Sequence, residues 1–203
     1  MAIANSADAL ASMLKIGGEG RGMTVRFTDL GVNRSGSAWE MQLPKLSRGE
    51  PVYRFPVLVQ PVYDGVPVMW TGERLCNGVG LALANRSEAE TERELFVKLH
   101  GVQLDGELTR YAHGLVFVVH DIPSAEDVVD RWRHIEQVLP EDGVLVVRSL
   151  CVQAQRANFA KVAAEMFALG FGGITVYLPG YKYVEGRSEG VVRITLRDWE
   201  RME

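Results

Sequence analysis

The sequence has little cysteine, no long apolar run and no excess of positive charge. Its two cysteines, Cys76 and Cys151, have no metal-binding spacing and stand in apolar contexts. We therefore expect small buried thiols, a reducing and cytoplasmic compartment, and no zinc site. The longest apolar stretches, such as 115–119, are far shorter than the roughly 20 residues that cross a bilayer, so no membrane span is expected.

Charge and motif content exclude further classes of protein. With 22 Lys and Arg against 26 Asp and Glu, the net charge of −4 argues against coating of nucleic acid by overall positive charge, although a local basic patch is allowed. The phosphate-loop pattern Gly-x-x-x-x-Gly-Lys-Ser/Thr and the Gly-x-Ser-x-Gly elbow are absent, which argues against P-loop nucleotide hydrolysis and serine esterase chemistry. The N-terminus has no cationic start before its apolar residues, so no secretory signal is expected.

What is present is a globular composition. The 203 residues are 47% hydrophobic, which is enough for one sizeable core, and no linker or repeat divides them. We therefore predict a single domain over residues 1–203.

In the first half of the chain, local signals predict short elements. A helix is expected up to about Lys15, where a glycine-rich stretch ends it, followed by a strand at 23–28. A helical turn is expected from Ala38 to Leu43. The proline-rich segment 44–67 favours edge strands or loops, and a Ser-x-x-Glu capping box at 87–90 predicts a helix over 88–98.

In the second half, strands and helices are expected to alternate. The apolar run 115–119 is typical of a central strand ending at Asp121, and an apolar stripe with helical spacing follows Ser124. The expected elements are a strand at 115–120, a helix at 124–139, a strand at 144–147, a helix at 158–169, and strands at 174–178 and 191–196. This order predicts an α/β protein with a doubly wound, mostly parallel sheet and a C-terminal antiparallel hairpin.

In such a sheet, ligands bind at the carboxyl ends of the strands, where several polar residues of this chain are expected. Asp121 ends a buried strand and is either a site carboxylate or a helix cap shared with Ser124. Arg148 is placed to pair with Asp121 across neighbouring strands, or to form an ordinary ion pair. Glu189 is by default a solvated hairpin residue, and His120, as a lone histidine at a strand end, more often has a structural role.

Taken together, these segments resemble a known family. The strand Met23–Gly31 with its Asp-Leu-Gly end, the turn Ser35–Trp39, the strand ending at Asp121, the segment Leu139–Val147 and the closing Arg-Ser-Glu at 187–189 are similar to the FtsJ-like RNA ribose 2'-O-methyltransferases. The resemblance implies a Rossmann-like methyltransferase fold and activity as an S-adenosylmethionine-dependent RNA (cap) 2'-O-methyltransferase. Because divergent forms of this fold are common among the capping enzymes of RNA viruses, it also suggests a viral origin. The resemblance covers most of the chain except residues from about 44 to 110.

The resemblance also implies roles for individual residues. Of the family's Lys-Asp-Lys-Glu tetrad, Asp121 matches the aspartate and Glu189 the glutamate, Arg148 takes the place of the second lysine, and Lys15 is the candidate for the first. The remaining implied contacts are as follows: Asp29, Gly31, Ser35, Gly36, Asp105 and Asp121 with S-adenosylmethionine, and Lys182, Arg187 and Arg193 with RNA.

Arg148 departs from the family pattern in a way that matters for the chemistry. A guanidinium stays protonated in proteins, so Arg148 can stabilise an alkoxide but cannot accept its proton. A catalytically inactive methyltransferase-fold module for binding or assembly is therefore the alternative, and it would act through a protein partner or a homo-oligomer. A different Rossmann-like enzyme for small molecules also stays open.

Overall fold

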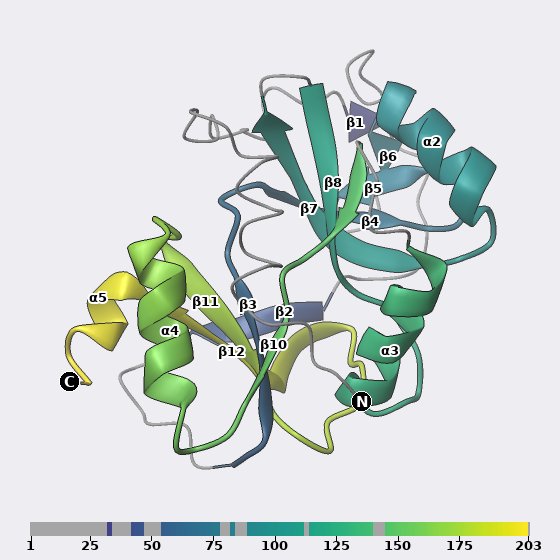
Figure 1. Ribbon diagram of the computed structural model, residues 1–203. Helices are drawn as coiled ribbons and strands as arrows, with labels where there is room; N and C mark the ends of the chain where they lie inside the picture. Colours follow the sequence, from purple (N-terminus) through teal and green to yellow (C-terminus); the bar gives the residue numbers. More distant parts are fainter. Residues whose placement is uncertain are drawn as a thin grey trace.

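The computed structural model of the protein describes residues 32–33, 42–46, 54–77, 82–83, 89–111, 114–139 and 145–202. Its strands form two sheets, which lie in different parts of the molecule in Figure 1. We call the seven-stranded sheet, with order β1-β6-β5-β4-β7-β8-β9, sheet A, and the five-stranded sheet, with order β10-β3-β11-β12-β2, sheet B.

Sheet A is formed mainly from the middle of the chain. Its strands are β1 (Val32–Asn33), β4 (Val66–Trp70), β5 (Leu75–Asn77), β6 (Ala82–Leu83), β7 (Leu104–Tyr111), β8 (Gly114–Asp121) and β9 (Val146–Arg148). The two longest strands, β7 and β8, pair as an antiparallel hairpin, whereas β8 and β9 are parallel.

Sheet B combines an early part of the chain with its C-terminal part. Its strands are β2 (Gln42–Leu46), β3 (Val57–Pro61), β10 (Val152–Ala154), β11 (Gly173–Tyr177) and β12 (Gly186–Thr195). Strand β3 lies between β10 and β11 and is antiparallel to both, and β12 is antiparallel to β11 and parallel to β2.

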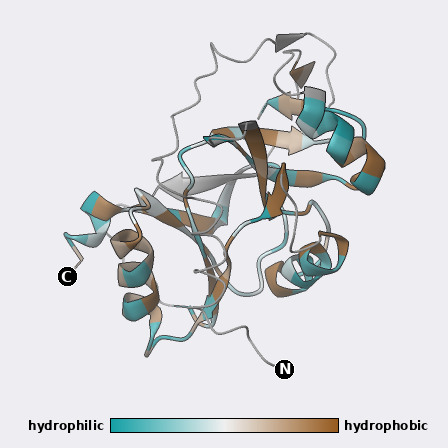
Figure 2. Ribbon diagram, turned by 45° about the horizontal axis from the view of Figure 1, so that its top comes forward, coloured by the Kyte–Doolittle hydropathy of each residue, from teal (hydrophilic) through white to brown (hydrophobic). Residues whose placement is uncertain are grey.

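Helices cover one face of each sheet. Helices α2 (Ala89–Leu99) and α3 (Val128–Val138) lie beside sheet A, and α4 (Phe159–Ala168) and the short α5 (Leu196–Trp199) lie beside sheet B, on the opposite side of the molecule (Figure 1). The central strands are mostly hydrophobic, whereas each long helix carries both hydrophilic and hydrophobic residues (Figure 2). This pattern is that of amphipathic helices that bury one stripe against a sheet.

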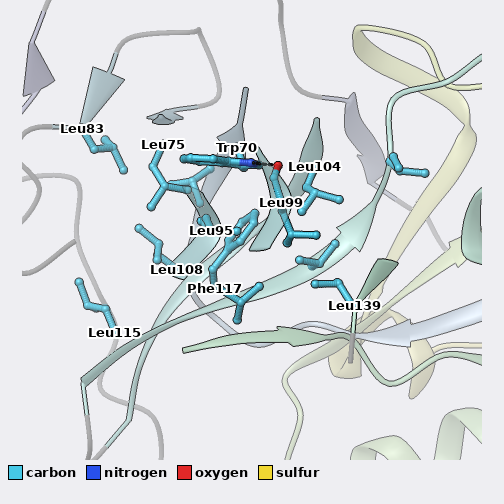
Figure 3. Close-up of a cluster of buried hydrophobic side chains, with 14 of the residues drawn as sticks. Trp70, Leu75, Leu83, Leu95, Leu99, Leu104, Leu108, Leu115, Phe117 and Leu139 are labelled. Carbon is cyan, nitrogen blue, oxygen red and sulfur yellow. Dashed lines mark hydrogen bonds between the residues drawn. The ribbon is translucent and has the colours of Figure 1, made fainter. Parts of the chain in front are cut away.

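Each sheet has its own apolar core on its helix-covered face, which we call its outer face. In sheet A, Trp70 and Phe117 are fully buried among leucines from α2 and the strands, and the Trp70 indole N–H donates to the Leu99 carbonyl at 3.1 Å (Figure 3). In sheet B, Met166 of α4 and Trp199 of α5 pack on Val59 and its neighbours. Burial of these side chains stabilises each layer by roughly 1.5–3 kcal/mol per large residue.

The predicted fold class is wrong. We expected one mostly parallel, doubly wound sheet, but the described pairings are antiparallel except for β8–β9 and β2–β12. The unit β8-α3-β9 is indeed a parallel crossover, but the chain then leaves sheet A, and β11 pairs with the distant β3. Apolar runs predict that a strand is buried, and they do not indicate its partner or direction, which is why the prediction failed.

Most individual elements from residue 88 onward were predicted correctly. The helices expected at 88–98 and 158–169 are α2 and α4, and the expected terminal hairpin is β11–β12. Helix α3 begins later than expected because its N-cap is Asp127, whose carboxylate accepts from the Val129 N–H at 2.9 Å, rather than Ser124. The helical turn predicted at 38–43 is wrong where it can be compared, since β2 begins at Gln42, and β3 is a central strand rather than an edge strand.

Candidate site at the junction of the two sheets

Polar side chains gather on the inner faces of the two sheets, that is, on the faces turned away from α2 and α4. Along β7, the side chains of Leu104 and Leu108 belong to the outer core. Because side chains alternate along a strand, those of Asp105 and Glu107 lie on the opposite, inner face. On sheet B, Gln60, Thr175 and Arg193 are direct neighbours across β3, β11 and β12. Contacts between these two sets define the site.

His120 reaches the junction because β8 carries a bulge. In the β7–β8 register Asp105 pairs with Asp121 and Gly106 pairs with Val119, so that His120 is the extra residue. Bulges redirect side chains and are frequent beside functional sites. Here the bulge lets the His120 side chain, which is 12% exposed, meet sheet B.

Gln60 fixes both the position and the tautomer of His120. The Gln60 Nε2 donates to the His120 carbonyl at 2.9 Å, which leaves Gln60 Oε1, an acceptor, 3.0 Å from His120 Nδ1. Because two acceptors do not bond, the proton of the neutral imidazole is on Nδ1 and Nε2 carries a lone pair. Within the described part of the chain, Nε2 is buried and has no hydrogen-bond partner.

Glu107 lies next to His120 Nε2. Its Oε1 is 3.7 Å from His120 Nε2, and its Oε2 accepts from the Gly65 N–H at 3.1 Å. Burial lowers the pKa of His120 below its ordinary value, an effect that the negative charges of Glu107 and Asp121 oppose and the positive charge of Arg193 reinforces. Burial thus favours the neutral form of this histidine, although a carboxylate lies beside it.

Asp121, the strongest site residue predicted from the sequence, forms a buried ion pair with Arg131 rather than with Arg148. The Arg131 guanidinium, 1% exposed, donates through Nε to Asp121 Oδ1 at 2.9 Å and through a terminal nitrogen to Oδ2 at 3.1 Å. Burial raises the pKa of the Asp121 carboxyl, and Arg131 and the Ile122 N–H act in the opposite direction. Both carboxylate oxygens of Asp121 thus accept hydrogen bonds within the protein, and we assign Asp121 the structural role of holding Arg131 in place.

Arg131 and Tyr183 also fasten the loop between β11 and β12 to sheet A. A further Arg131 nitrogen donates to the carbonyls of Glu126 (2.8 Å) and Tyr181 (3.2 Å), and its guanidinium carbon lies 6.0 Å from the centre of the Tyr183 ring. The Tyr183 hydroxyl in turn donates to the Asp105 carboxylate. These contacts join the buried carboxylates of Asp105 and Asp121 to the loop 178–185.

Two chain crossings between the sheets lie side by side at the junction. The first, from β3 to β4, contains Tyr63, and the second, from β9 to β10, contains Leu150. The Leu150 N–H donates to the Tyr63 hydroxyl at 2.9 Å. The Tyr63 ring lies 5.7 Å from that of His120 and 5.3 Å from that of Phe171. The first crossing thus places one aromatic ring, that of Tyr63, beside His120 at the junction.

The predicted site residues are only partly brought together. Asp105 and Asp121 are neighbours across β7 and β8, and Arg148 in β9 is next to Val119. Arg193 is half-buried at the inner face, whereas Glu189 in β12 and Lys182 in the preceding loop are exposed. The side chain of Arg187 is not described. Residues Lys15, Asp29, Gly31, Ser35 and Gly36 lie outside the described residues.

Sequence reasoning missed Gln60, Glu107, Arg131 and Tyr183. Two signals could have found some of them. The strict alternation at 104–109 is typical of a strand with one polar face. Arg131 lies three residues after Val128 and four before Ile135, inside the apolar stripe of α3. Gln60 and Tyr183 gave no signal, because their roles come from tertiary contacts.

The structure was compared with known proteins. No protein-family model matches the sequence, and no curated protein matches it either. A structure of a Lig E DNA ligase, studied for DNA binding with a minimal scaffold, matches with a TM-score of 0.60 at 14% identity, over 77% of this chain and 68% of the ligase chain. The adenylate of Chlorella virus DNA ligase matches with a TM-score of 0.62 at 18% identity, over 78% and 68% of the two chains.

The chain has the fold of these DNA ligases. A third structure, mycobacterial DNA ligase D in complex with ATP and MES, agrees with a TM-score of 0.62 at 14% identity and covers 78% of this chain and 60% of its own. At such identities the comparison establishes the fold, which we call the ligase fold, and not the activity.

The ligase fold overturns the methyltransferase interpretation. The resemblance to FtsJ-like RNA 2'-O-methyltransferases, the assignment of S-adenosylmethionine as cofactor, and the association with mRNA capping are all wrong, since the matched structures are DNA ligases, one solved as an adenylate and one with ATP. The quoted methyltransferase motifs are short, and several fall in strands of a different topology.

The described residues also bear on two other types of site. They contain no group of three or more His, Cys, Asp or Glu side chains arranged to hold a metal ion. Within the same ranges, none of the helices has the length and apolar character needed to traverse a bilayer.

Proposed function

We propose that this chain binds an adenine nucleotide between the inner faces of sheets A and B and uses it in nucleotidyl transfer on nucleic acid, as a DNA-ligase-like protein. The observation that carries the proposal is that polar side chains of both sheets, among them Gln60, Glu107 and His120, meet at the junction of the two inner faces, next to buried apolar residues of those faces. Ligand sites combine such apolar support with a few convergent polar groups. The adenylate and ATP complexes among the matched ligases supply the ligand class.

The described inner faces offer groups suited to each part of a nucleotide. Arg193, half-buried on β12, is a cation for phosphate, and its guanidinium suits a phosphate oxygen pair. The Tyr63 ring provides an apolar surface for a base. In phosphoryl-type transfer a protein contributes mainly positioning and charge stabilisation, which fixed charged groups such as these supply.

Charge distribution favours the C-terminal part of the chain, which supplies three of the five strands of sheet B, as the part that contacts nucleic acid. Residues 145–202 contain eight Lys and Arg against five Asp and Glu, whereas the described residues of 62–139 contain six against twelve. Phosphate backbones attract clustered cations even in an acidic protein. The residues predicted to bind RNA, Lys182, Arg187 and Arg193, all belong to this basic segment.

Label transfer tests the proposal. The full chain is incubated with ATP labelled in its α-phosphate, alone and with nicked duplex DNA, and protein-bound and DNA-bound label are separated on denaturing gels. We expect label on protein or DNA in the wild type, reduced at least about tenfold in Arg193→Ala, because one charged hydrogen bond is worth roughly 1.5–3 kcal/mol. Lys161→Ala, which changes a 79%-exposed side chain on α4, is the matched control and should label normally.

A second candidate is a protein that binds nucleotide and nucleic acid without transfer. It is favoured by the character of the described junction, where the lysine side chains in view, Lys98, Lys161 and Lys182, are all exposed and none lies on an inner face. An amine is one of the nucleophiles through which enzymes form covalent intermediates. ATP binding by calorimetry without label transfer would support this candidate, and the absence of both would contradict nucleotide binding altogether.

A further inference from the structure

The junction contains two hydrogen-bond acceptors that face each other. Gln60 holds the His120 proton on Nδ1, so the lone pair of Nε2 points toward Glu107 Oε1 at 3.7 Å. Glu107 is prevented from turning away by its bond from the Gly65 N–H. A proton placed on Nε2 would convert this arrangement into a charge-assisted hydrogen bond.

Charged and polar groups from four elements face His120. Glu107 comes from β7, Asp121 from β8 and Arg193 from β12, while Gln60 of β3 contacts the imidazole. Tyr63, in the crossing that follows β3, lies against the ring. The charge of Asp121 is already balanced by that of Arg131. The groups near His120 whose electrostatic effect a bound ligand can change are therefore Arg193 and Glu107.

We propose that binding of a nucleotide phosphate at Arg193 is coupled to uptake of one proton by His120, which then donates from Nε2 to Glu107. The coupling rests on the proposed nucleotide site and adds a regulatory property to it: the affinity rises as pH falls. The only covalent change is the new N–H bond, and its proton comes from solvent.

The physical cause is electrostatic. In the free protein, burial and the Arg193 charge disfavour an imidazolium, and the Glu107 carboxylate favours it. An anionic phosphate next to Arg193 cancels the unfavourable charge and leaves the favourable one in place. Since affinity and protonation are linked, one coupled proton changes the binding constant by up to about tenfold per pH unit.

Calorimetry in buffers of different ionisation enthalpy tests the coupling. ATP is titrated into the full chain at about pH 6.5, and the proton count is taken from the dependence of the heat on the buffer. ATP phosphate itself titrates near pH 6, so the measured quantity is the difference from His120→Gln. We expect the wild type to take up a fraction of a proton more than His120→Gln, and His134→Gln, which changes an exposed histidine of α3, to match the wild type.

Nuclear magnetic resonance of the wild type gives an answer that does not depend on a variant's folding. The His120 ring resonance is followed against pH with and without saturating ATP, and its midpoint should rise on binding. ATP binding with equal proton counts and an unmoved midpoint would overturn the coupling while the nucleotide site stands. No ATP binding at any pH would overturn both.

Discussion

At the scale of single residues, the buried pair Arg131–Asp121 should control stability more than any exposed charge. Removing the guanidinium in Arg131→Met leaves a carboxylate that is 7% exposed without its cation. Such a change typically costs about 3–5 kcal/mol. Urea denaturation of the wild type and the variant measures the difference.

The matched control for this substitution lies two residues away on the same helix. Arg133 contacts Asp130 at 2.6 Å, but the two side chains are 49% and 56% exposed. Arg133→Ala should therefore change the free energy of unfolding by only about 0–1 kcal/mol. Equal losses in the two variants would show that burial of the Arg131 pair is not what matters.

His120 predicts a pH dependence of stability with a definite sign. Because burial lowers its pKa below the ordinary 6.5, the unfolded chain binds this proton at a higher pH than the folded chain. The contribution of His120 is fully present above pH 6.5 and is lost as pH falls below that value toward the lowered folded pKa.

Denaturation series between pH 8 and pH 5 provide the measurement. His120→Gln should flatten the decline of stability below pH 6.5, and the exposed His134→Gln should leave it as in the wild type. A wild-type stability that rises as pH falls through this window would contradict the assignment of His120 as a neutral buried group.

At the scale of elements, the β7–β8 hairpin depends on a glycine beside the bulge. A Cβ added at Gly106 would lie 2.1 Å from the Val118 carbonyl oxygen, which is backbone of the paired strand and cannot move away alone. Gly106→Ala should destabilise the protein by about 1–3 kcal/mol or more through overpacking. At Gly172 the nearest atom is 3.4 Å away, so Gly172→Ala should stay within about 0.5 kcal/mol in the same denaturation assay.

How far the sequence predicts these elements depends on how local their signals are. Helix α4 and strands β8 and β11 follow from periodicity and glycine stops that lie within the segment itself. The strand β7 was missed because Asp105, Gly106 and Glu107 lower its average hydrophobicity, although alternate positions remain apolar. Strand β3 was mistaken for an edge because of its prolines, and its central place depends on partners more than 90 residues later.

In the site, too, the sequence indicates individual residues but not the residues with which they pair. Asp121 was found because it ends an apolar run, yet its partner was expected in the next strand and is instead Arg131 on the helix between. The His120–Gln60 contact joins residues 60 positions apart in two different sheets. No local pattern encodes such a contact, since it requires the bulge in one sheet and the packing of the other.

At the scale of the whole molecule, stabilisation by ligands distinguishes the proposed binding of an adenine nucleotide from the discarded binding of S-adenosylmethionine. ATP at 100 times its dissociation constant should raise the free energy of unfolding by about 2.7 kcal/mol. S-adenosylmethionine at the same concentration should produce no shift. Thermal denaturation with each ligand measures this, and stabilisation by S-adenosylmethionine alone would contradict the proposed nucleotide site.

The division into two sheets could not be predicted from the sequence, because it depends on how the two layers pack against each other. Each layer has apolar periodicities that fit equally well a single sheet covered on both sides. The two arrangements differ in the polar contacts that join the sheets, such as Gln60–His120, and in the contact Tyr63–Leu150 between the two chain crossings.

The apolar core beside each sheet contains a tryptophan, so intrinsic fluorescence can report on the two halves of the molecule. Trp70 is fully buried in the sheet A core and Trp199 is 8% exposed in that of sheet B, while Trp132 of α3 packs against apolar groups of both. Emission from variants that retain only Trp70 or only Trp199 would follow the melting of each half separately. Because α3 ties the halves together, the two curves should superimpose, and Arg131→Met should be the change that drives them apart.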